Sequence, residues 1–334
     1  MKVENHFAEF AQYFDLQKGH LNFDGHAVVH SAGVDFSGGS SFRISAEDFE
    51  EREVLGSGNY GTVFKVLHKP TKVNMALKEI RLELDKNRLE AIVNELEILN
   101  RCHSPNIVQF FGAFFIEGGV YICMEYMDAG SLASLYHSGI DEPYLAKIAL
   151  AVVKGLSYLK KEHNVMHRDI KPTNILLSTT GEIKLCDFGV SKKLVASLAR
   201  TNIGCQPYMA PERIFTGNNA DGSSSISTYN VQADVWSLGL SLLEAAIGKY
   251  PYLPEVTSSI FAQLTAIVRD DSPELPADRF SKEAVDFCAL CLKKDSTLRP
   301  SYSQLLEHAW LVKYTEIDVN MVDFVLDRLN KTKT

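Results

Sequence analysis

The stretch that decides the fold is His167-Arg168-Asp169-Ile170-Lys171-Pro172-Thr173-Asn174, followed after short apolar segments by Asp187-Phe188-Gly189. It offers a carboxylate, Asp169, that can accept a hydroxyl proton, and a cation, Lys171, that can bind a phosphate. Asn174 and Asp187 add an amide and a second carboxylate that can hold Mg²⁺. Each tripeptide alone occurs by chance. Their order and spacing predict a phosphoryl-transfer site in place of a charged surface loop.

Composition limits the class of protein. A chain of 334 residues with 46% hydrophobic residues can form one large domain or one domain in two lobes. Its net charge of -8 argues against a nucleic acid or an anionic membrane as the main partner. Cys288 and Cys291 form a lone CxxC in an apolar run, which predicts a core helix and not a zinc site. With no signal-peptide pattern and no run of 18 apolar residues, we expect a soluble cytoplasmic protein.

A second motif is glycine-rich and reads Gly56-Ser57-Gly58-Asn59-Tyr60-Gly61-Thr62-Val63. The same glycines occur in dinucleotide-binding folds, and Glu79 stands near the position of the ribose-binding carboxylate there. The residues from Thr62 to Leu67 are β-branched, aromatic or aliphatic, so they predict a strand and not a helix. We therefore expect a hairpin whose backbone N–H groups lie over ATP phosphates.

The next predicted strand carries a lysine that needs a partner. Lys78 ends the apolar run Met75-Ala76-Leu77-Lys78, where an unpaired ammonium would be costly. Residues 85–100 have the spacing of a helix, and Glu95 lies at the edge of its apolar face. We predict an ion pair between Lys78 and Glu95 and not a solvated Glu95.

These motifs together resemble the eukaryotic protein kinases over residues 49–310. The residues that carry the resemblance are Gly56, Gly58, Gly61, Lys78, Glu95, His167-Arg168-Asp169, Asn174, Asp187-Phe188-Gly189, Ala210-Pro211-Glu212, Asp234 and Arg299. The resemblance implies an α+β, bilobal protein kinase fold with a small β-rich N-lobe (49–124), a hinge (125–130) and a large, mainly helical C-lobe (131–310). Residues 1–48 are then an N-terminal extension, interpreted as a short amphipathic helix around Phe7–Phe14 and a linker, and residues 311–334 are a C-terminal tail.

The resemblance also implies roles for single residues. Asp169 would orient the substrate hydroxyl and accept its proton, Lys171 would steady the γ-phosphate, and Asn174 and Asp187 would hold Mg²⁺. Lys78 would grip the α- and β-phosphates once Glu95 is docked. The expected ATP-binding residues are Leu55, Gly56, Ser57, Gly58, Asn59, Tyr60, Gly61, Thr62, Val63, Ala76, Lys78, Met124, Glu125, Met127, Ser131 and Leu176. Glu212 and Arg299 are expected to form a buried structural ion pair.

Within that family, the chain resembles the MAP kinase kinases. The stretches that carry this are 104–108, 123–127, 184–191 and 204–213, and Cys205 points to the stress-activated branch. Residues 114–118 and 194–201 are most similar to the fungal osmostress enzymes. The resemblance implies a dual-specificity enzyme that phosphorylates Thr and Tyr in the activation loop of a MAP kinase. It also implies activation by phosphorylation at Ser197 and Thr201.

Two partners follow from the same resemblance, a downstream MAP kinase substrate and an upstream MAP kinase kinase kinase. Residues 316–325 resemble the C-terminal site that docks the upstream kinase, but their apolar spacing equally suits a helix packed on the large lobe. The usual basic docking cluster for the MAP kinase is absent from residues 1–48, so docking occurs elsewhere or the chain is a trimmed form. We expect a monomer that binds neither nucleic acid nor membrane.

Three alternatives stay open at the level of sequence. A pseudokinase scaffold would lack one of Lys78, Asp169, Asn174 or Asp187, and all four are present. A plain serine/threonine kinase would share the motifs but not the dual specificity, and a small-molecule kinase would not need Ala210-Pro211-Glu212.

Cys186 is either a reactive thiol facing the nucleotide or a small core residue.

Overall fold

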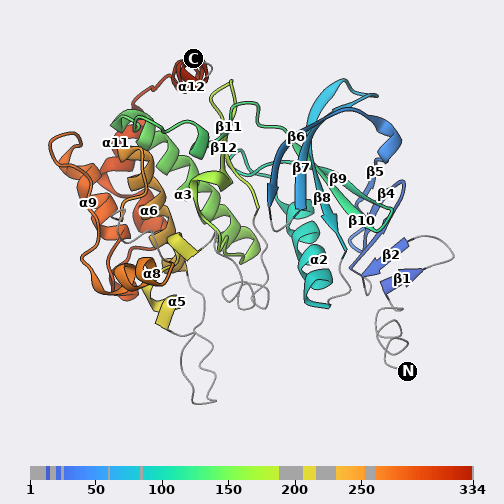
Figure 1. The fold of residues 1–334 in the computed structure, drawn as a ribbon, viewed down its shortest axis with the longest axis horizontal. Helices are drawn as coiled ribbons and strands as arrows, with labels where there is room; N and C mark the ends of the chain where they lie inside the picture. The colour runs from blue at the N-terminus through green and yellow to red at the C-terminus, as the bar shows by residue number, and fades with distance from the viewer. Residues whose placement is uncertain are drawn as a thin grey trace, which may run out of the picture. The chain divides into compact units, whose positions relative to one another are not determined.

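The structure is a computed structural model that describes residues 13–15, 20–23, 26–58, 61–82, 86–187, 206–215, 231–252 and 260–332 (Figure 1). These residues divide into two compact units. The N-terminal unit contains the described residues up to His103 together with Val108–Met127, and the C-terminal unit contains the others. Strands dominate the first unit and helices the second, which confirms the predicted α+β class.

The main sheet of the N-terminal unit has five antiparallel strands in the order β6-β7-β8-β10-β9. Their bounds are β6 Phe49–Gly58, β7 Gly61–His68, β8 Val73–Arg81, β9 Phe110–Ile116 and β10 Gly119–Glu125. Helix α2, Lys86–Arg101, matches the helix expected at 85–100 and buries the apolar side chains Leu89, Ile92, Val93, Leu96 and Leu99. Strand β9 is an edge of this sheet.

The two faces of the main sheet carry different residues. Val63 is paired with Lys78, and Ala76 with Met124, and paired residues of antiparallel strands point to the same face. Because Ala76 and Lys78 are two residues apart on β8, all four side chains share one face. The opposite face is covered by an apolar cluster of Ile44, Val66, Met75, Leu77, Phe114 and Cys123. One face is thus fixed by hydrophobic packing, and the other carries the residues expected to bind nucleotide.

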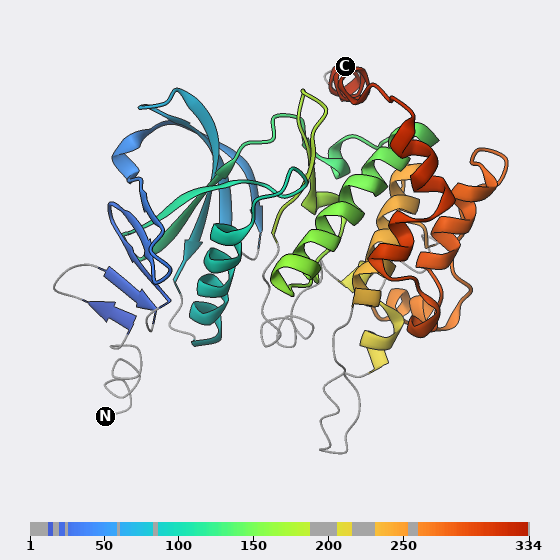
Figure 2. The same cartoon turned by 180° about the vertical axis from the view of Figure 1, so that it is seen from behind.

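A second sheet precedes the main one and corrects the interpretation of residues 20–48 as a linker. Most of the helix expected around Phe7–Phe14 lies outside the described residues, and only its end is described, with Phe14 in a strand. In place of the expected linker, the described residues form five antiparallel strands in sequence order. They are β1 Phe14–Asp15, β2 His20–Phe23, β3 Ala27–His30, β4 Gly33–Phe36 and β5 Ser41–Arg43. Alternate apolar residues of β2, β3 and β4 are buried, namely Leu21, Phe23, Ala27, Val29, Val34 and Phe36. The sheet packs along β9 in both views (Figures 1 and 2), which supplies the apolar partner that such short strands need.

The C-terminal unit is built around two buried helices, α3 Glu142–His163 and α6 Val231–Ile247. The apolar run expected as a buried helix at 145–159 lies inside α3. The other helices are η3 Leu132–Ser134, η4 Pro172–Asn174, η5 Gln206–Tyr208, α5 Pro211–Phe215, α8 Ile260–Arg269, α9 Lys282–Cys291, η7 Ser296–Leu298, α10 Tyr302–Leu306, α11 Ala309–Glu316 and α12 Met321–Thr332. A small sheet contains β11 Gly130–Ser131, β12 Ile175–Leu177 and β13 Ile183–Leu185.

Helix α9 holds the lone CxxC. Cys288 and Cys291 are both buried in it, and burial raises the pKa of the Cys288 thiol to about 12. The burial of both side chains within this helix confirms the prediction of a core helix for these cysteines.

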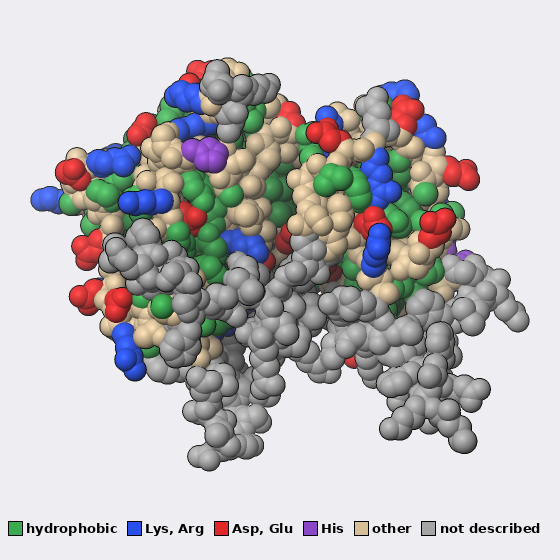
Figure 3. All heavy atoms as spheres, viewed as in Figure 1, with side chains coloured by type: hydrophobic (Ala, Val, Ile, Leu, Met, Phe, Trp, Pro, Cys, Tyr) green, Lys and Arg blue, Asp and Glu red, His purple; other side chains and the backbone are tan. Residues whose placement is uncertain are grey.

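The surface of each unit carries mixed charge. On the face drawn in Figure 3, acidic and basic side chains are interspersed with apolar and neutral ones. No helix within the described ranges combines the length and the apolar character that crossing a membrane requires.

Candidate active site

The glycine-rich motif forms the predicted hairpin between β6 and β7. Gly58 and Gly61 are the last register pair, and Ser57 is paired with Thr62 just before them. Gly61 has φ +116°, and a Cβ atom there would lie 1.8 Å from the carbonyl oxygen of Glu79. Only glycine fits this position. Asn59 and Tyr60, which were expected to bind ATP, lie outside the described residues.

The predicted ion pair between Lys78 and Glu95 is present. The Nζ–Oε1 distance is 2.8 Å, and the side chain of Lys78 is only 4% exposed while that of Glu95 is 17% exposed. A buried ammonium needs such a partner because its desolvation costs several kcal/mol. The pair links β8 to α2, so α2 occupies the position in which Glu95 reaches the lysine.

The other expected nucleotide-binding residues of the N-terminal unit lie along the main sheet. Val63, Ala76 and Met124 share the face that carries Lys78. Leu55 is 44% exposed on β6. At the end of β10, Glu125 donates its backbone N–H to the carbonyl of Gln109 at 2.9 Å and accepts the backbone N–H of Gln109 at 3.1 Å. These contacts fix the direction in which the chain leaves the sheet.

In the C-terminal unit, Asp234 at the start of α6 braces the HRD stretch. Its carboxylate accepts the backbone N–H of His167 at 3.0 Å and that of Arg168 at 2.8 Å, as well as the hydroxyl of Tyr302 at 3.1 Å. Arg168 has φ +71° and Asp187 has φ +57°, conformations that cost free energy for a residue with a side chain. A fully buried carboxylate with three donors can hold Arg168 in this backbone conformation.

His167 joins the two halves of the motif. Its Nδ1 accepts the backbone N–H of Asp169 at 3.3 Å, so its Nε2 carries the proton and donates to the carbonyl of Cys186 at 3.0 Å. Burial lowers the pKa of His167 from 6.5, although the carboxylates of Asp234, Asp169 and Asp187 act in the opposite direction. The neutral ring is therefore a structural link and not a proton donor for catalysis.

Asp169, Lys171 and Asn174 form one polar cluster. Oδ2 of Asp169 accepts from Nζ of Lys171 at 2.9 Å and from Nδ2 of Asn174 at 2.9 Å. The Asn174 amide also donates to the backbone carbonyl of Asp169 at 2.8 Å. The carboxylate of Asp169 is thus held by two side chains from the same short loop.

Asn174 and Asp187 are brought near each other by the backbone. The N–H of Cys186 donates to the carbonyl of Asn174 at 3.1 Å, which places Asp187 one residue beyond this contact. Nδ2 of Asn174 is used by Asp169, and its amide oxygen accepts the Thr173 hydroxyl at 3.4 Å, which leaves that oxygen a second lone pair for a cation. One amide oxygen and one carboxylate are the hard ligands that Mg²⁺ accepts, with phosphate oxygens and water completing the set. Cys186 itself is buried, which favours a small core residue over a reactive thiol that faces the nucleotide.

Two further expected nucleotide-binding residues lie in the small sheet of this unit. Ser131 of β11 and Leu176 of β12 are register partners, so their side chains share one face. Met127, which belongs to the N-terminal unit, is buried.

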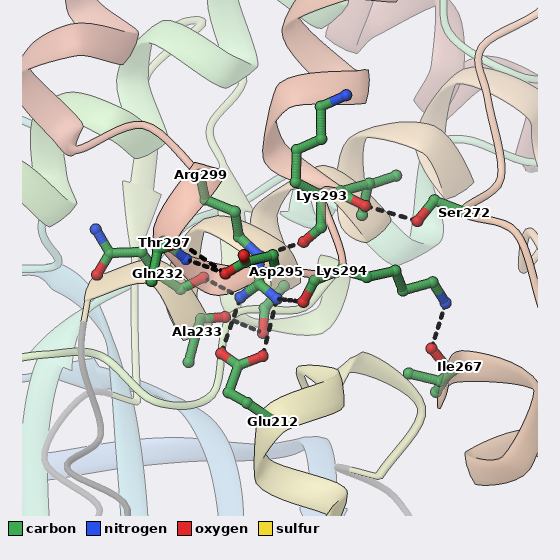
Figure 4. Close-up of polar contacts among 12 residues, drawn as sticks. Glu212, Gln232, Ala233, Ile267, Ser272, Lys293, Lys294, Asp295, Thr297 and Arg299 are labelled. Atoms are coloured by element: carbon green, nitrogen blue, oxygen red, sulfur yellow. Dashed lines mark hydrogen bonds and ion pairs between the residues drawn. The ribbon is translucent and has the colours of Figure 1, made fainter. Parts of the chain in front are cut away.

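The predicted ion pair of Glu212 and Arg299 is also present (Figure 4). The guanidinium binds both oxygens of Glu212 at 2.9 and 2.8 Å. Its remaining N–H groups donate to the carbonyls of Lys293 at 2.7 Å, Gln232 at 2.9 Å and Lys294 at 3.1 Å. The side chain of Arg299 is fully buried. The pair fixes α5, which begins at Pro211 of the Ala210-Pro211-Glu212 segment, against the segment that contains Arg299.

The sequence did not reveal a second support for this segment, which centres on Glu244. Its two oxygens accept the hydroxyls of Tyr136 at 2.5 Å and Tyr208 at 2.6 Å, and Ser237 Oγ donates to the carbonyl of Tyr208 at 2.8 Å. Burial and the Glu244 carboxylate raise the pKa of Tyr208, so its hydroxyl stays protonated and donates. The available signal was a glutamate inside the apolar run of α6, because a buried charge needs partners.

The C-terminal tail forms helix α12, which packs on the C-terminal unit. Phe324 is 4% exposed and stacks on Tyr144 of α3 with ring centroids 4.6 Å apart. Arg328 donates to Ser138 Oγ at 2.5 Å and to the carbonyl of Gly139 at 2.7 Å. The predicted packed helix is confirmed, and the docking role stays a prediction. A surface hollow of 560 Å³ beside the tail is lined by Asp141, Pro143, Tyr144, Tyr314, Ile317, Asp318, Val319 and Asn320.

Several predictions lie outside the described residues. They concern Phe188, Gly189 and Cys205, and above all the expected phosphorylation sites Ser197 and Thr201.

Comparison with known proteins gives the following similarities. A sequence model of the family described as "Protein kinase domain" matches residues 49–311. "MAP kinase kinase PBS2" of Saccharomyces cerevisiae is 56% identical over 331 residues, covering 97% of this chain and 49% of that protein. "Protein kinase wis1" of Schizosaccharomyces pombe is 56% identical over 329 residues, covering 98% of this chain and 54% of that protein. "Dual specificity mitogen-activated protein kinase kinase dSOR1" of Drosophila melanogaster is 43% identical over 304 residues, covering 83% and 74%. The chain spans about half the length of the two yeast relatives.

Proposed function

Because this chain belongs to the protein kinases, and within them to the MAP kinase kinases, we propose that it transfers the γ-phosphate of ATP to a MAP kinase. The observation that carries the proposal is the cluster in which Lys171 and Asn174 hold the carboxylate of Asp169. A pseudokinase scaffold would have no need of this arrangement. We place the catalytic domain at 49–310, between the N-terminal extension and the tail, and expect it to act in the cytoplasm.

The residues of the site divide the chemistry among them. Asp169 orients the substrate hydroxyl and accepts its proton, while Lys171 neutralises charge on the phosphoryl group. Lys78, held by Glu95, binds the α- and β-phosphates of ATP, and the backbone of the 56–63 hairpin covers them. Asn174 and Asp187 would hold Mg²⁺, which neutralises phosphate charge when bound. Positioning and charge neutralisation therefore supply most of the rate.

We propose dual specificity for Thr and Tyr of the MAP kinase activation loop. The proposal is supported by the name of the Drosophila relative, which states dual specificity for that protein. A stress-responsive cascade is supported by the similarity of residues 114–118 and 194–201 to fungal osmostress enzymes. The chain is 56% identical to the two yeast relatives and 43% identical to the fruit-fly relative, which agrees with a fungal origin of the similarity.

Activation is proposed to occur by phosphorylation of Ser197 and Thr201. Each phosphate adds a charge of about -1.5 to -2 and can pair with nearby basic side chains, which reorders a loop. An upstream kinase would reach the chain through the tail. Val322 and Leu326 are exposed on α12 one turn apart, at 36% and 42%, and offer an apolar contact on the side of the helix away from Phe324. Val322→Asp/Leu326→Asp should then reduce activation by the upstream kinase and leave the activity of a Ser197→Asp/Thr201→Asp protein unchanged.

The transfer itself is tested with γ-labelled ATP and a catalytically dead MAP kinase. In the Ser197→Asp/Thr201→Asp background, Asp169→Asn should reduce the rate of transfer by about 10²- to 10⁴-fold, the range expected for a general base. Asp286→Asn is the matched control, because Asp286 is a 65% exposed aspartate on α9, and it should retain the rate. Transfer by the Asp169→Asn protein at the rate of the control would refute the role of Asp169. Nucleotide binding without transfer by any of these proteins would favour the scaffold alternative.

A further inference from the structure

The small N-terminal sheet is built into the N-terminal unit by its apolar face. Leu21 is paired with Val29, and Val29 with Val34, so alternate residues of β2, β3 and β4 point to one side, where they are buried. Phe36 and Phe42 contact Phe110 of β9 edge-on, with ring centroids 6.3 and 5.1 Å apart. The sheet therefore covers the edge strand β9, which would otherwise be exposed.

Gly112 of β9 makes this close approach possible. Its φ is +143°, and a Cβ atom there would lie 2.8 Å from Cγ2 of Ile44 and 3.2 Å from Cβ of Phe42. A larger residue would push the two parts of the chain away from each other. The contact therefore depends on the absence of a side chain at Gly112, which lets Phe42 and Ile44 pack directly against β9.

From this fixed position the sheet also reaches helix α2. Nδ1 of His26 lies 2.8 Å from Oε1 of Glu97. The backbone of His26 is held on both sides, because its N–H donates to the carbonyl of Phe23 at 2.8 Å and its carbonyl accepts from Ser37 at 3.0 Å. The histidine thus connects the sheet to α2, two residues from Glu95.

A connection at Glu97 bears on the position of Glu95. The Lys78–Glu95 ion pair forms only while α2 lies close to β8, and a helix moves as a rigid body over a few residues. Any contact present in this position of α2 and lost when α2 moves away shifts the equilibrium toward the paired state. The contact between His26 and Glu97 has this property.

We propose that the sheet of residues 13–43 is a positioning element for α2, and that His26 and Glu97 are the positioning residues that keep Glu95 on Lys78. Neither residue touches the nucleotide or the substrate. The inference rests on the proposed role of the Lys78–Glu95 pair in nucleotide binding. It assigns a function in the kinase reaction to a segment that precedes the matched kinase domain.

The test measures α2 and nucleotide binding in the same variants. In the full chain, His26→Ala should speed amide hydrogen exchange within residues 86–101 and raise the dissociation constant of Mg-ADP, each by about two- to five-fold, the range of an exposed pair. His26→Asn places an amide N–H near the position of Nδ1, so it should restore both values. The matched control is His30→Ala on the same sheet, since His30 contacts Asp35, Arg43 and the Ala32 backbone within the sheet.

Lys78→Met separates the two proposals. If Lys78→Met weakens Mg-ADP binding but His26→Ala changes neither quantity, the positioning role is wrong while the proposed function stands. Faster exchange of α2 without a change in Mg-ADP affinity also overturns the inference, because the contact would then not act on Lys78. If Lys78→Met itself leaves Mg-ADP affinity unchanged, the proposed role of the ion pair fails first.

Discussion

Replacement of Arg299 should strongly lower the stability of the C-terminal unit. Its guanidinium donates five hydrogen bonds, two to Glu212 and one each to the carbonyls of Gln232, Lys293 and Lys294, and the side chain is fully buried. In Arg299→Lys the charge remains, but an ammonium has three N–H groups, so at least two of the five acceptors lose their donor. Each buried acceptor without a donor costs about 1–3 kcal/mol. The free energy of unfolding should therefore fall by about 2–6 kcal/mol.

Denaturant unfolding followed by the fluorescence of the buried Trp236 and Trp310 measures this loss. Arg279→Lys is the matched control, because Arg279 is exposed in the same unit and should change stability by less than about 0.5 kcal/mol. Faster proteolysis near residues 206–215 should accompany the loss, since Glu212 anchors this segment. A loss below about 1 kcal/mol for Arg299→Lys would show that the five contacts do not carry the stability assigned to them.

Three further perturbations should have distinct effects. Gly61→Ala should weaken Mg-ADP binding and lower the melting temperature, because its Cβ would collide with the carbonyl of Glu79 at the hairpin end; an unchanged affinity would contradict the observed hairpin geometry. The pKa of His167 is lower in the folded chain than in the unfolded chain. As the pH falls below 6.5, the unfolded chain therefore binds a proton at this residue that the folded chain does not yet bind. The free energy of unfolding should fall by up to about 1.4 kcal/mol per pH unit below that pH, a dependence that His167→Gln should reduce in denaturant titrations at pH 7 and 5.5. Phe324→Ala should weaken the packing of α12 on the C-terminal unit by about 3–5 kcal/mol and make the tail more sensitive to protease. A tail as resistant to protease as that of the unchanged protein would show that the stacking on Tyr144 is dispensable.

Two ion pairs were predicted from the sequence, one from the cost of burying a charge and one from a family resemblance. Lys78 lies in an apolar strand, so its ammonium required a carboxylate, and Glu95 was predicted because it lies at the edge of the apolar face of the next helix. Glu212 and Arg299 were identified through a family resemblance and not from local chemistry. In both cases the structure shows the expected pair.

The N-terminal sheet was missed because its signal is divided among very short strands. Strands of two to four residues carry at most two buried apolar side chains each, and the helical spacing that ends at Phe14 suggested a different element. Its apolar face is completed by β9, which is distant in sequence. A local pattern could not reveal that partner. The same applies to Tyr136 and Tyr208, whose hydroxyls meet on Glu244 only through the tertiary fold.

The measurement that tests the central proposal most directly is phosphosite mapping by mass spectrometry. A catalytically dead stress-type MAP kinase is incubated with Mg-ATP and the Ser197→Asp/Thr201→Asp protein, with the same protein carrying Asp169→Asn as control. The proposed function predicts phosphate on both Thr and Tyr of the activation loop and none with the control. Phosphate on Thr alone would contradict dual specificity and favour a plain serine/threonine kinase, and equal phosphate with the control would contradict catalysis through Asp169.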